Sequence, residues 1–302
     1  MRWEGREESQ NVEDRRRMPR GGGMAIGGGV GGIIFVILFL LLGGDPRALL
    51  DPQQNPNVAQ QFDEADRGND SEVDPNDPLA KFSSVVLKDT EDVWHQMAPQ
   101  LNQVAKEYGL RRIQYTDPTM VLYRDGTRTA CGSANSAVGP FYCPGDSKLY
   151  LDLSFFQELQ ERFRAPGDFA MAYVIAHEVG HHVQHQLGLS EMVQRKQQEL
   201  PRAEGNEWSV RLELQADYLA GVWAHQAQRM KNILERGDLE EALNAASRIG
   251  DDVLQKEATE RVRPDAFTHG SAKQRVRWLR AGMTSGDLSK MMAPMELPYE
   301  DL

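Results

Sequence analysis

The sequence predicts an α+β fold, mainly helical with a small sheet, preceded by one transmembrane helix. Strand-like segments lie between residues 111 and 153, and most later segments repeat apolar residues at helical spacing. A long uncharged stretch and a proline-rich acidic stretch come before them. The 302 residues therefore divide into a cytoplasmic tail at 1–20, an anchor at 21–44, a linker at 45–80 and one folded domain at 81–302.

The predicted anchor has no charged residue from 21 to 44, and its second half, 33–42, is purely apolar. A helix of this length spans about 36 Å, which exceeds the roughly 30 Å of a hydrocarbon core. A cleaved signal peptide is the alternative, but the sequence GGDPRALL that follows contains no small-x-small cleavage site. Arginines precede the stretch at positions 15, 16, 17 and 20. The positive-inside rule then predicts a single-pass protein of the cell membrane, with a cytoplasmic N-terminus and an extracytoplasmic domain.

Most of the negative charge lies in the linker. The chain has a net charge of −11, and residues 45–80 contain nine acidic and two basic side chains. Such a proline-rich, acidic segment is extended by its own repulsion. A nucleic-acid-binding protein normally presents a basic surface, so we expect no nucleic-acid partner.

The folded region begins with a helix expected at 83–108, where apolar residues recur at helical spacing until Gly109. Short strands are expected next, at 111–115, 119–123, 140–143 and 148–153. Helical patterns fill most of the remaining chain, at 155–163, 167–187, 190–200, 207–231, 239–256 and 271–282.

The residues that carry chemistry are His177-Glu178-Val179-Gly180-His181, inside the apolar pattern of 170–187. Helical positions i and i+4 differ by about 40° in direction, so both imidazoles project from one side, one turn apart. This separation suits two ligands of one Zn²⁺ at about 2.0–2.1 Å. Glu178 lies about 100° around the helix, where a carboxylate can take a proton from water at the metal. A chance match is the alternative, but two unpaired histidines in a buried helix would be costly.

A zinc site needs a third ligand. One class of sites has a third histidine six residues after the second, but Leu187 occupies that position. His182 and His185 extend the cluster along the helix. Three consecutive turns of one straight helix cannot easily surround one ion, so we place these two histidines at the rim of the site.

Glu213 is the better candidate for the third ligand. Glu213 and Asp217 are one turn apart on the helix at 207–231, on a face otherwise made of small residues. This face permits close approach of the helix that holds the histidines, with Asp217 accepting a hydrogen bond from a liganding imidazole. A solvated acidic face, or pairing of Glu213 with Arg202 or Arg211, is the alternative.

These motifs resemble a bacterial family of neutral zinc metallopeptidases. The resemblance rests on HEVGHHVQHQLG, followed about 30 residues later by RLELQADYLAGVWA. Three further segments occur in the family's order: CGSANSAVGPFYCPGDSKLYLDLSFF, AASRIGDDVLQK and THGSAKQRVRWLRAG. The resemblance covers roughly 81–285 and the glycine-rich N-terminal stretch. It implies a zincin-like fold and zinc peptidase chemistry more than it implies a substrate.

A more distant resemblance concerns residues 268–275. This segment is similar to the His-Pro-rich segment of membrane-linked metallopeptidases of the prenylated-protein-processing and heat-shock types, with Gly270 where a proline is usual. The similarity implies that His269 donates a hydrogen bond to the developing oxyanion. The alternative is that His269 only begins a helix and that Arg275 pairs with an acid such as Asp217.

In the fold class implied by the resemblance, an edge strand beside the active-site helix commonly binds the peptide substrate. Residues 148–153 (KLYLDL) form the one run that suits this role. An ordinary sheet strand explains the same pattern equally well.

The chain has two cysteines, Cys131 and Cys143. In an exported domain we expect them to form a disulfide, worth about 3 kcal/mol in the chain-entropy model. In the cytosol they would be free thiols or metal ligands instead.

Taken together, the sequence predicts a membrane-anchored zinc metallopeptidase that acts on a peptide or protein substrate. His177, His181 and Glu213 hold Zn²⁺, and Glu178 is the general base. His269 is the second predicted catalytic residue. Two alternatives remain: a non-catalytic envelope binding module with a structural zinc, and a zinc amidase that acts on cell-wall peptides.

Overall fold

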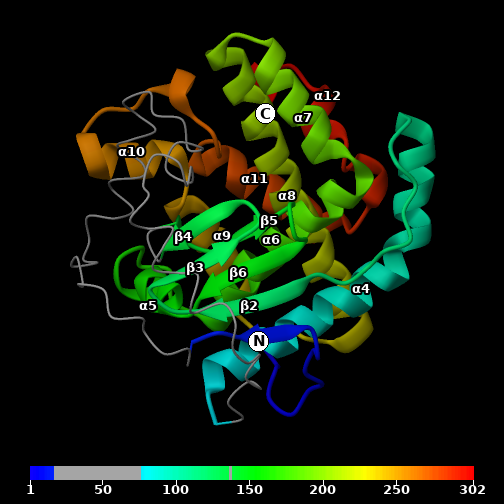
Figure 1. Ribbon diagram of the computed structural model, residues 1–302, viewed down its shortest axis with the longest axis vertical. Coiled ribbons are helices and arrows are strands. Elements are labelled where there is room, and N and C mark those ends of the chain that lie inside the picture. Colours follow the sequence, from blue (N-terminus) through cyan, green and yellow to red (C-terminus); the bar gives the residue numbers. More distant parts are fainter. Residues whose placement is uncertain (17–75, 136–137) are drawn as a thin grey trace.

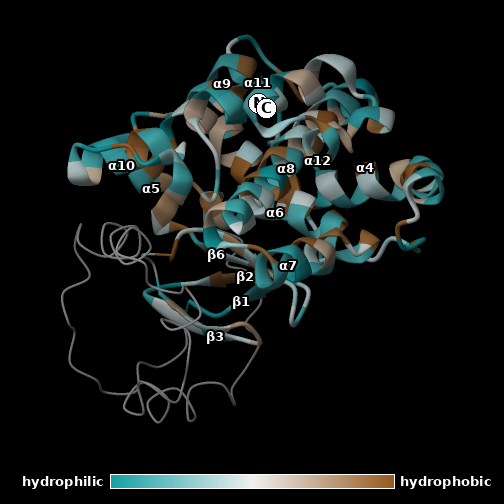
Figure 2. Cartoon of the chain, turned by 90° about the horizontal axis from the view of Figure 1, so that it is seen from above, coloured by the Kyte–Doolittle hydropathy of each residue, from teal (hydrophilic) through white to brown (hydrophobic). Residues whose placement is uncertain are grey.

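The computed structural model describes residues 1–16, 76–135 and 138–302. Figure 1 shows helices gathered around a small sheet. Figure 2, the view from above, shows most of these helices on one side of the sheet. The predicted α+β fold, mainly helical with a small sheet, is confirmed.

The main sheet has four strands in the order β1-β2-β6-β5, with β5 antiparallel to β6 and the other neighbours parallel. Their bounds are Val12–Asp14 for β1, Thr119–Tyr123 for β2, Lys148–Asp152 for β6 and Phe141–Cys143 for β5. β6 is hydrogen-bonded on both sides, so the suggestion that 148–153 is an open edge for a peptide is wrong. The edge strand on this side of the sheet is β5.

The two faces of the sheet bury different clusters because successive side chains of a strand point to opposite faces. Met120 and Leu122 face the helices and join the main core. Val121 and Tyr123 point the other way, into a smaller cluster with Cys143. A separate hairpin of β3 (Gly126–Thr129) and β4 (Gly132–Asn135) follows β2, and Cys131 in its turn packs against this cluster and is disulfide-bonded to Cys143. The predicted disulfide is therefore present.

The first sixteen residues belong to this same domain. Val12 pairs with Met120 in parallel register, and the Arg15 N–H donates to the Leu122 carbonyl at 2.8 Å. The guanidinium of Arg16 contacts the Asp77 carboxylate, so residues 16 and 77 lie together. The prediction that 1–20 forms a separate tail is wrong for its described part, because the sheet is completed by a strand from this segment.

The helices of the described residues begin with α4, whose first residue, Pro78, lies three residues before the predicted domain boundary and follows a side-chain cap at Asp77. They are α4 (Pro78–Tyr108), α5 (Ser154–Glu161), α6 (Asp168–Leu187), α7 (Leu189–Glu199), α8 (Arg202–Lys231), α9 (Asp238–Arg248), α10 (Asp251–Thr259), α11 (Ala272–Ser285) and α12 (Ala293–Glu296). Short 3₁₀ turns occur at Pro264–Ala266, Leu288–Lys290 and Tyr299–Asp301.

Two predicted elements differ from the structure. Residues 111–115 form no strand, and the single helix expected at 239–256 is divided into α9 and α10. Gly250 lies at the division, where an added Cβ would be 2.2 Å from the backbone nitrogen of Ala272. The break therefore allows the start of α11 to approach the chain closely.

Glycines also set the spacing of the central helices α6, α8 and α11. An added Cβ on Gly180 of α6 would lie 3.1 Å from the Ala216 carbonyl of α8. An added Cβ on Gly282 of α11 would lie 2.1 Å from the Tyr218 carbonyl. A larger residue at position 282 would clash with the backbone of α8, and one at position 180 would push α6 and α8 slightly apart. The two glycines thus bring the helices with His177, Glu213 and Arg275 together.

The predicted anchor at 21–44 and most of the predicted linker lie outside the described residues. Within residues 1–16, 76–135 and 138–302, no helix is long and apolar enough to span a membrane.

Candidate metal centre and active site

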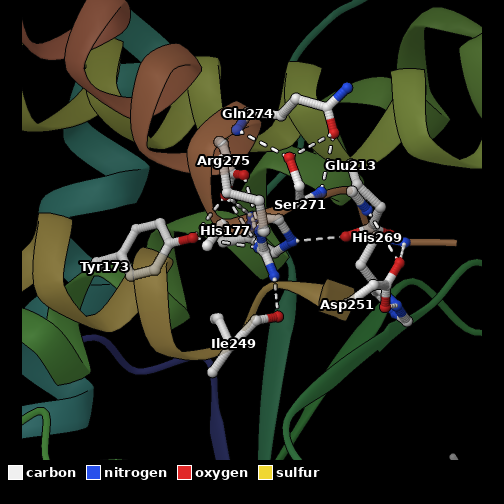
Figure 3. A network of polar contacts seen from close by, with 12 residues as sticks. Tyr173, His177, Glu213, Ile249, Asp251, His269, Ser271, Gln274 and Arg275 are labelled. Carbon is white, nitrogen blue, oxygen red and sulfur yellow. Dashed lines mark hydrogen bonds and ion pairs between the residues drawn. The ribbon is translucent and has the colours of Figure 1, made fainter. Parts of the chain in front are cut away.

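Two histidines of α6 and a glutamate of α8 converge on one point. The rings of His177 and His181 are 4.8 Å apart between centroids. Nε2 of His177 lies 3.1 Å from one carboxylate oxygen of Glu213, and Nε2 of His181 lies 3.4 Å from the other. Figure 3 shows the His177 ring pointing toward Glu213. The structure thus brings together the three residues that the sequence predicts as ligands.

The remaining ring nitrogens show what this cluster can bind. Nδ1 of His177 lies 2.9 Å from Asp217 Oδ1, and Nδ1 of His181 lies 2.8 Å from Gln184 Oε1. When each Nδ1–H donates to its oxygen, each Nε2 keeps a lone pair directed at Glu213. Ligand atoms around a tetrahedral zinc are about 3.3 Å apart, for bonds of about 2.0–2.1 Å. The spacing and donor set therefore fit Zn²⁺ with three protein ligands.

The charges around the centre also favour a cation. Without a metal ion, burial disfavours the imidazolium of His177, but the carboxylates of Asp217 and Glu213 raise its pKa to about 9. Burial likewise opposes the charge of Glu213, yet the two histidines hold its pKa well below the ordinary value. The electrostatics of the centre therefore favour a positive charge, such as a proton or a metal ion would supply.

Asp217 lies behind the centre and is completely buried. In addition to the His177 Nδ1–H, it accepts a hydrogen bond from the Tyr173 hydroxyl at 2.6 Å and two from Arg275, at 2.9 and 3.0 Å. Burial raises the free energy of its charged form, but Arg275 and His177 hold its pKa at about 2. Asp217 is thus placed where the sequence predicts an orienting carboxylate. Arg275 pairs with it, as the sequence alternative suggested.

Glu178 and His269 both line the pocket that opens beside the centre, together with His177, His181 and Glu213. Burial raises the pKa of the Glu178 carboxyl, against the lowering effect of the two histidines. A carboxylate here faces the space where water and a substrate would meet the metal. Its position fits the general base that the sequence predicts.

His269 is held by Asp251, the first residue of α10. One oxygen of Asp251 accepts the backbone N–H groups of Thr268, His269 and Gly270 at 2.7, 2.6 and 3.1 Å. The other lies 3.3 Å from His269 Nδ1. Figure 3 shows Asp251 directly beside the His269 ring. The departure from proline at position 270 now has a physical reason, because Gly270 has φ of +90° and uses an N–H that proline lacks.

The two other histidines of α6 lie outside the cluster of possible ligands. His182 is buried, and its ring nitrogens lie 3.0 Å from the Tyr142 hydroxyl and 2.7 Å from the Thr116 carbonyl. Burial lowers its pKa to about 4. His182 therefore connects α6 to β5 as a neutral side chain, while His185 lies 3.6 Å from Glu191.

The structure adds three supporting residues that the sequence reasoning missed. Tyr173 could have been found, because it precedes His177 by four residues and so lies on the same helical face. Gln184 follows His181 by three residues and has the same kind of local signal. Asp251 has no such signal, since its contact with His269 depends on how the chain folds back between α10 and α11.

The pocket beside the centre has a volume of about 510 Å³, within the usual range for ligand sites. Its metal side contains the polar residues described above. Its remaining lining is largely apolar, with Phe141, Phe155, Phe163, Val174 and Leu254 among the residues that form it.

The fold brings together a His-Glu-x-x-His helix and a glutamate from the following long helix, a residue set that could hold a metal ion. The chain belongs to the family described as "Putative neutral zinc metallopeptidase", whose sequence profile matches residues 1–292. This match confirms the family resemblance, and it includes the segment that contains β1.

Similar proteins are found in several bacteria. The "Uncharacterized protein YpfJ" of Escherichia coli K12 is 47% identical over 295 residues, which cover 95% of this chain and 96% of that protein. The "Uncharacterized protein Rv2575" of Mycobacterium tuberculosis H37Rv is 45% identical over 183 residues, which cover 57% of this chain and 61% of that protein. No solved structure matches the chain.

Proposed function

We propose that this protein is a zinc metallopeptidase that hydrolyses peptide bonds. The observation that carries the proposal is the convergence of His177 Nε2, His181 Nε2 and the Glu213 carboxylate beside an open pocket that Glu178 also lines. Three protein ligands with an open position are typical of catalytic zinc sites, whereas structural sites are closed by four.

The chain's own residues would divide the reaction among them. A zinc ion in this site would act as a Lewis acid toward the scissile carbonyl and toward water. Glu178 would accept a proton from the attacking water and return it to the departing amine nitrogen. His269 would donate a hydrogen bond from Nε2 to the oxyanion, because Asp251 engages the opposite ring nitrogen.

Glu178→Gln tests this function in the zinc-loaded full-length chain. We expect roughly a 10²–10⁴-fold loss of peptide hydrolysis with unchanged zinc content, because the amide cannot accept the proton. Glu204→Gln is the matched control, since Glu204 is an exposed residue more than two helical turns before Glu213 on α8 and does not line the pocket. Equal activity of the Glu178→Gln protein and wild type would overturn the assignment.

The two alternative functions, a non-catalytic binding module and a zinc amidase, predict different results in digestion experiments. A binding module with a structural zinc would hold zinc but cleave neither peptides nor cell-wall fragments. An amidase would release products from muropeptides and leave ordinary peptides intact. Parallel digestion of a peptide library and a muropeptide preparation, each with the Glu178→Gln protein as blank, separates these outcomes from a peptidase.

Membrane attachment through residues 21–44 is proposed from the sequence alone. The structure places one condition on it. A single crossing between residues 16 and 76 would separate Val12–Asp14 from Thr119–Tyr123, although these two segments are paired in one sheet. The condition is therefore that both segments lie on the same side of the membrane. The compartment of the domain stays a prediction.

A further inference from the structure

The pocket beside the metal centre carries an inference about substrate class, which rests on the proposed peptidase function. We propose that it binds a large apolar side chain, aromatic or long aliphatic, of an internal residue next to the cleaved bond.

The apolar wall borders the metal ligands directly. Val174 precedes His177 by three residues on α6, so both side chains lie on one helical face and both line the pocket. Phe155 and Phe163, from α5 and the turn after it, also line the pocket. A substrate whose carbonyl reaches the metal centre therefore places a neighbouring side chain against this surface.

The size of the pocket suits a large side chain. Its volume of about 510 Å³ compares with the roughly 150 Å³ that is enough for a benzene molecule in an apolar cavity. Leu254 of α10 and Phe141 of β5 are only half-buried, and they form the outer part of the lining. A small side chain would leave most of this surface in contact with water.

The charges of the pocket argue against a charged side chain. Its ionisable lining residues are His177, Glu178, His181, Glu213, His269 and Arg275, together with Tyr142 and Tyr173. Arg275 is bound to Asp217, and His269 is held by Asp251. A charged substrate side chain against Phe155 and Val174 would lose water without gaining a partner.

The distribution of charged residues in the pocket also favours cleavage of an internal peptide bond over cleavage at the end of a chain. Arg275 is the one lysine or arginine in the lining, and both of its Asp217 contacts are fully buried. No lysine or arginine side chain of the described lining is therefore available to bind a terminal carboxylate. Capped peptides should be cleaved as well as uncapped ones.

The experiment uses full-length zinc-loaded protein and peptides with an acetylated N-terminus and an amidated C-terminus. One residue beside the scissile bond is varied among Phe, Leu, Ala, Asp and Lys, and products are identified by mass spectrometry. We expect kcat/KM to be at least about tenfold higher for Phe and Leu than for Ala, and higher still relative to Asp and Lys. Binding of the same peptides to the Glu178→Gln protein, measured by fluorescence anisotropy, should follow the same order.

Leu254→Arg tests the wall itself. It should reduce the preference for Phe over Asp by at least about tenfold while zinc content and unfolding temperature stay unchanged. Leu239→Arg is the matched control, because Leu239 is 40% exposed on α9 and does not line the pocket.

The outcomes separate this inference from the function on which it rests. Cleavage without an apolar preference, or cleavage only of peptides with a free carboxyl terminus, would overturn the inference alone. An apolar preference in binding without any cleavage would support the inference and overturn the peptidase function. Neither binding nor cleavage by wild type would overturn both.

Discussion

Arg275 of α11 donates two hydrogen bonds to Asp217 of α8, from Nε to Oδ2 at 2.9 Å and from Nη2 to Oδ1 at 3.0 Å. Both side chains are almost completely buried, with exposures of 4% and 0%. The carboxylate that orients His177 is thus kept charged by an arginine from a helix that contributes no metal ligand. Loss of this contact should therefore affect both the stability of the fold and the orientation of the predicted metal ligand His177.

The first prediction concerns this ion pair. Asp217→Asn removes the charge that fixes the His177 ring, so we expect zinc affinity to fall by about 10–100-fold. Competition with a chromophoric chelator measures this affinity. Asp265→Asn is the control, because Asp265 is exposed and pairs with Arg263. Unchanged affinity in the Asp217→Asn protein would show that Asp217 does not orient a ligand.

Arg275→Ala should act on stability as well. It leaves the Asp217 charge buried without its strongest partner, which costs roughly 3–5 kcal/mol of unfolding free energy. Urea unfolding of the zinc-free protein measures the loss. The double variant Arg275→Ala/Asp217→Asn should recover part of it, since no uncompensated charge remains. A loss below about 1 kcal/mol in the single variant would contradict the assignment of a buried ion pair.

A second prediction concerns the protonation of His269. Its side chain is about half exposed, and although desolvation opposes its charge, the Asp251 carboxylate raises its pKa to about 9. The stabilisation from this pair is fully present below the ordinary histidine pKa of about 6.5 and is lost as pH rises through about 9. Because the pKa of Asp251 is lowered in turn, the pair is also lost in acid, as pH falls below the ordinary aspartate value.

Asp251→Asn should therefore move the His269 pKa down toward its ordinary value. Titration of the ring by NMR in the zinc-free protein measures the shift, and Asp252→Asn serves as the control for the same helix start. If His269 titrates near 6.5 in wild type as well, the Asp251–His269 contact has no electrostatic role.

A third prediction follows from the pairing of β1 with β2. Gln10 is an exposed residue of the segment 1–16, and Glu240 is an exposed residue of α9. Because the first segment is paired with the rest of the domain, single cysteines at these two positions should lie in the same compartment. A membrane-impermeant maleimide applied to intact cells should label both cysteines or neither, with lysed cells as the control for reactivity. Labelling of one alone would show that residues 1–16 and the domain lie on opposite sides of a membrane.

The metal centre could be predicted from the sequence because its spacing is local. His177 and His181 are one turn apart on one helix, and so are Glu213 and Asp217 on another, which limits how the two helices can meet. The helix end at Gly109 was also predicted, and Gly188 directly follows the expected end of the other helix at residue 187. Both glycines have the left-handed conformation that ends a helix.

The parts that could not be predicted depend on contacts between distant residues. β1 has three residues, too few for a strand pattern, and its partner β2 begins more than 100 residues later. The arginines that follow β1 read as the flank of a membrane anchor, yet Arg16 binds Asp77 within the domain. The sequence predicts Asp251 only as part of a longer helix, because nothing in 239–256 indicates its contact with His269.

The most direct test of the central claim is the zinc content of purified full-length protein and of its ligand variants. Wild type should contain close to one zinc per chain after dialysis, and the exposed-residue control Glu204→Gln should be the same. Glu213→Ala, His177→Ala and His181→Ala should each lose most of the metal, because two remaining ligands hold zinc poorly. Stoichiometric zinc that survives Glu213→Ala unchanged would contradict the three-residue metal centre.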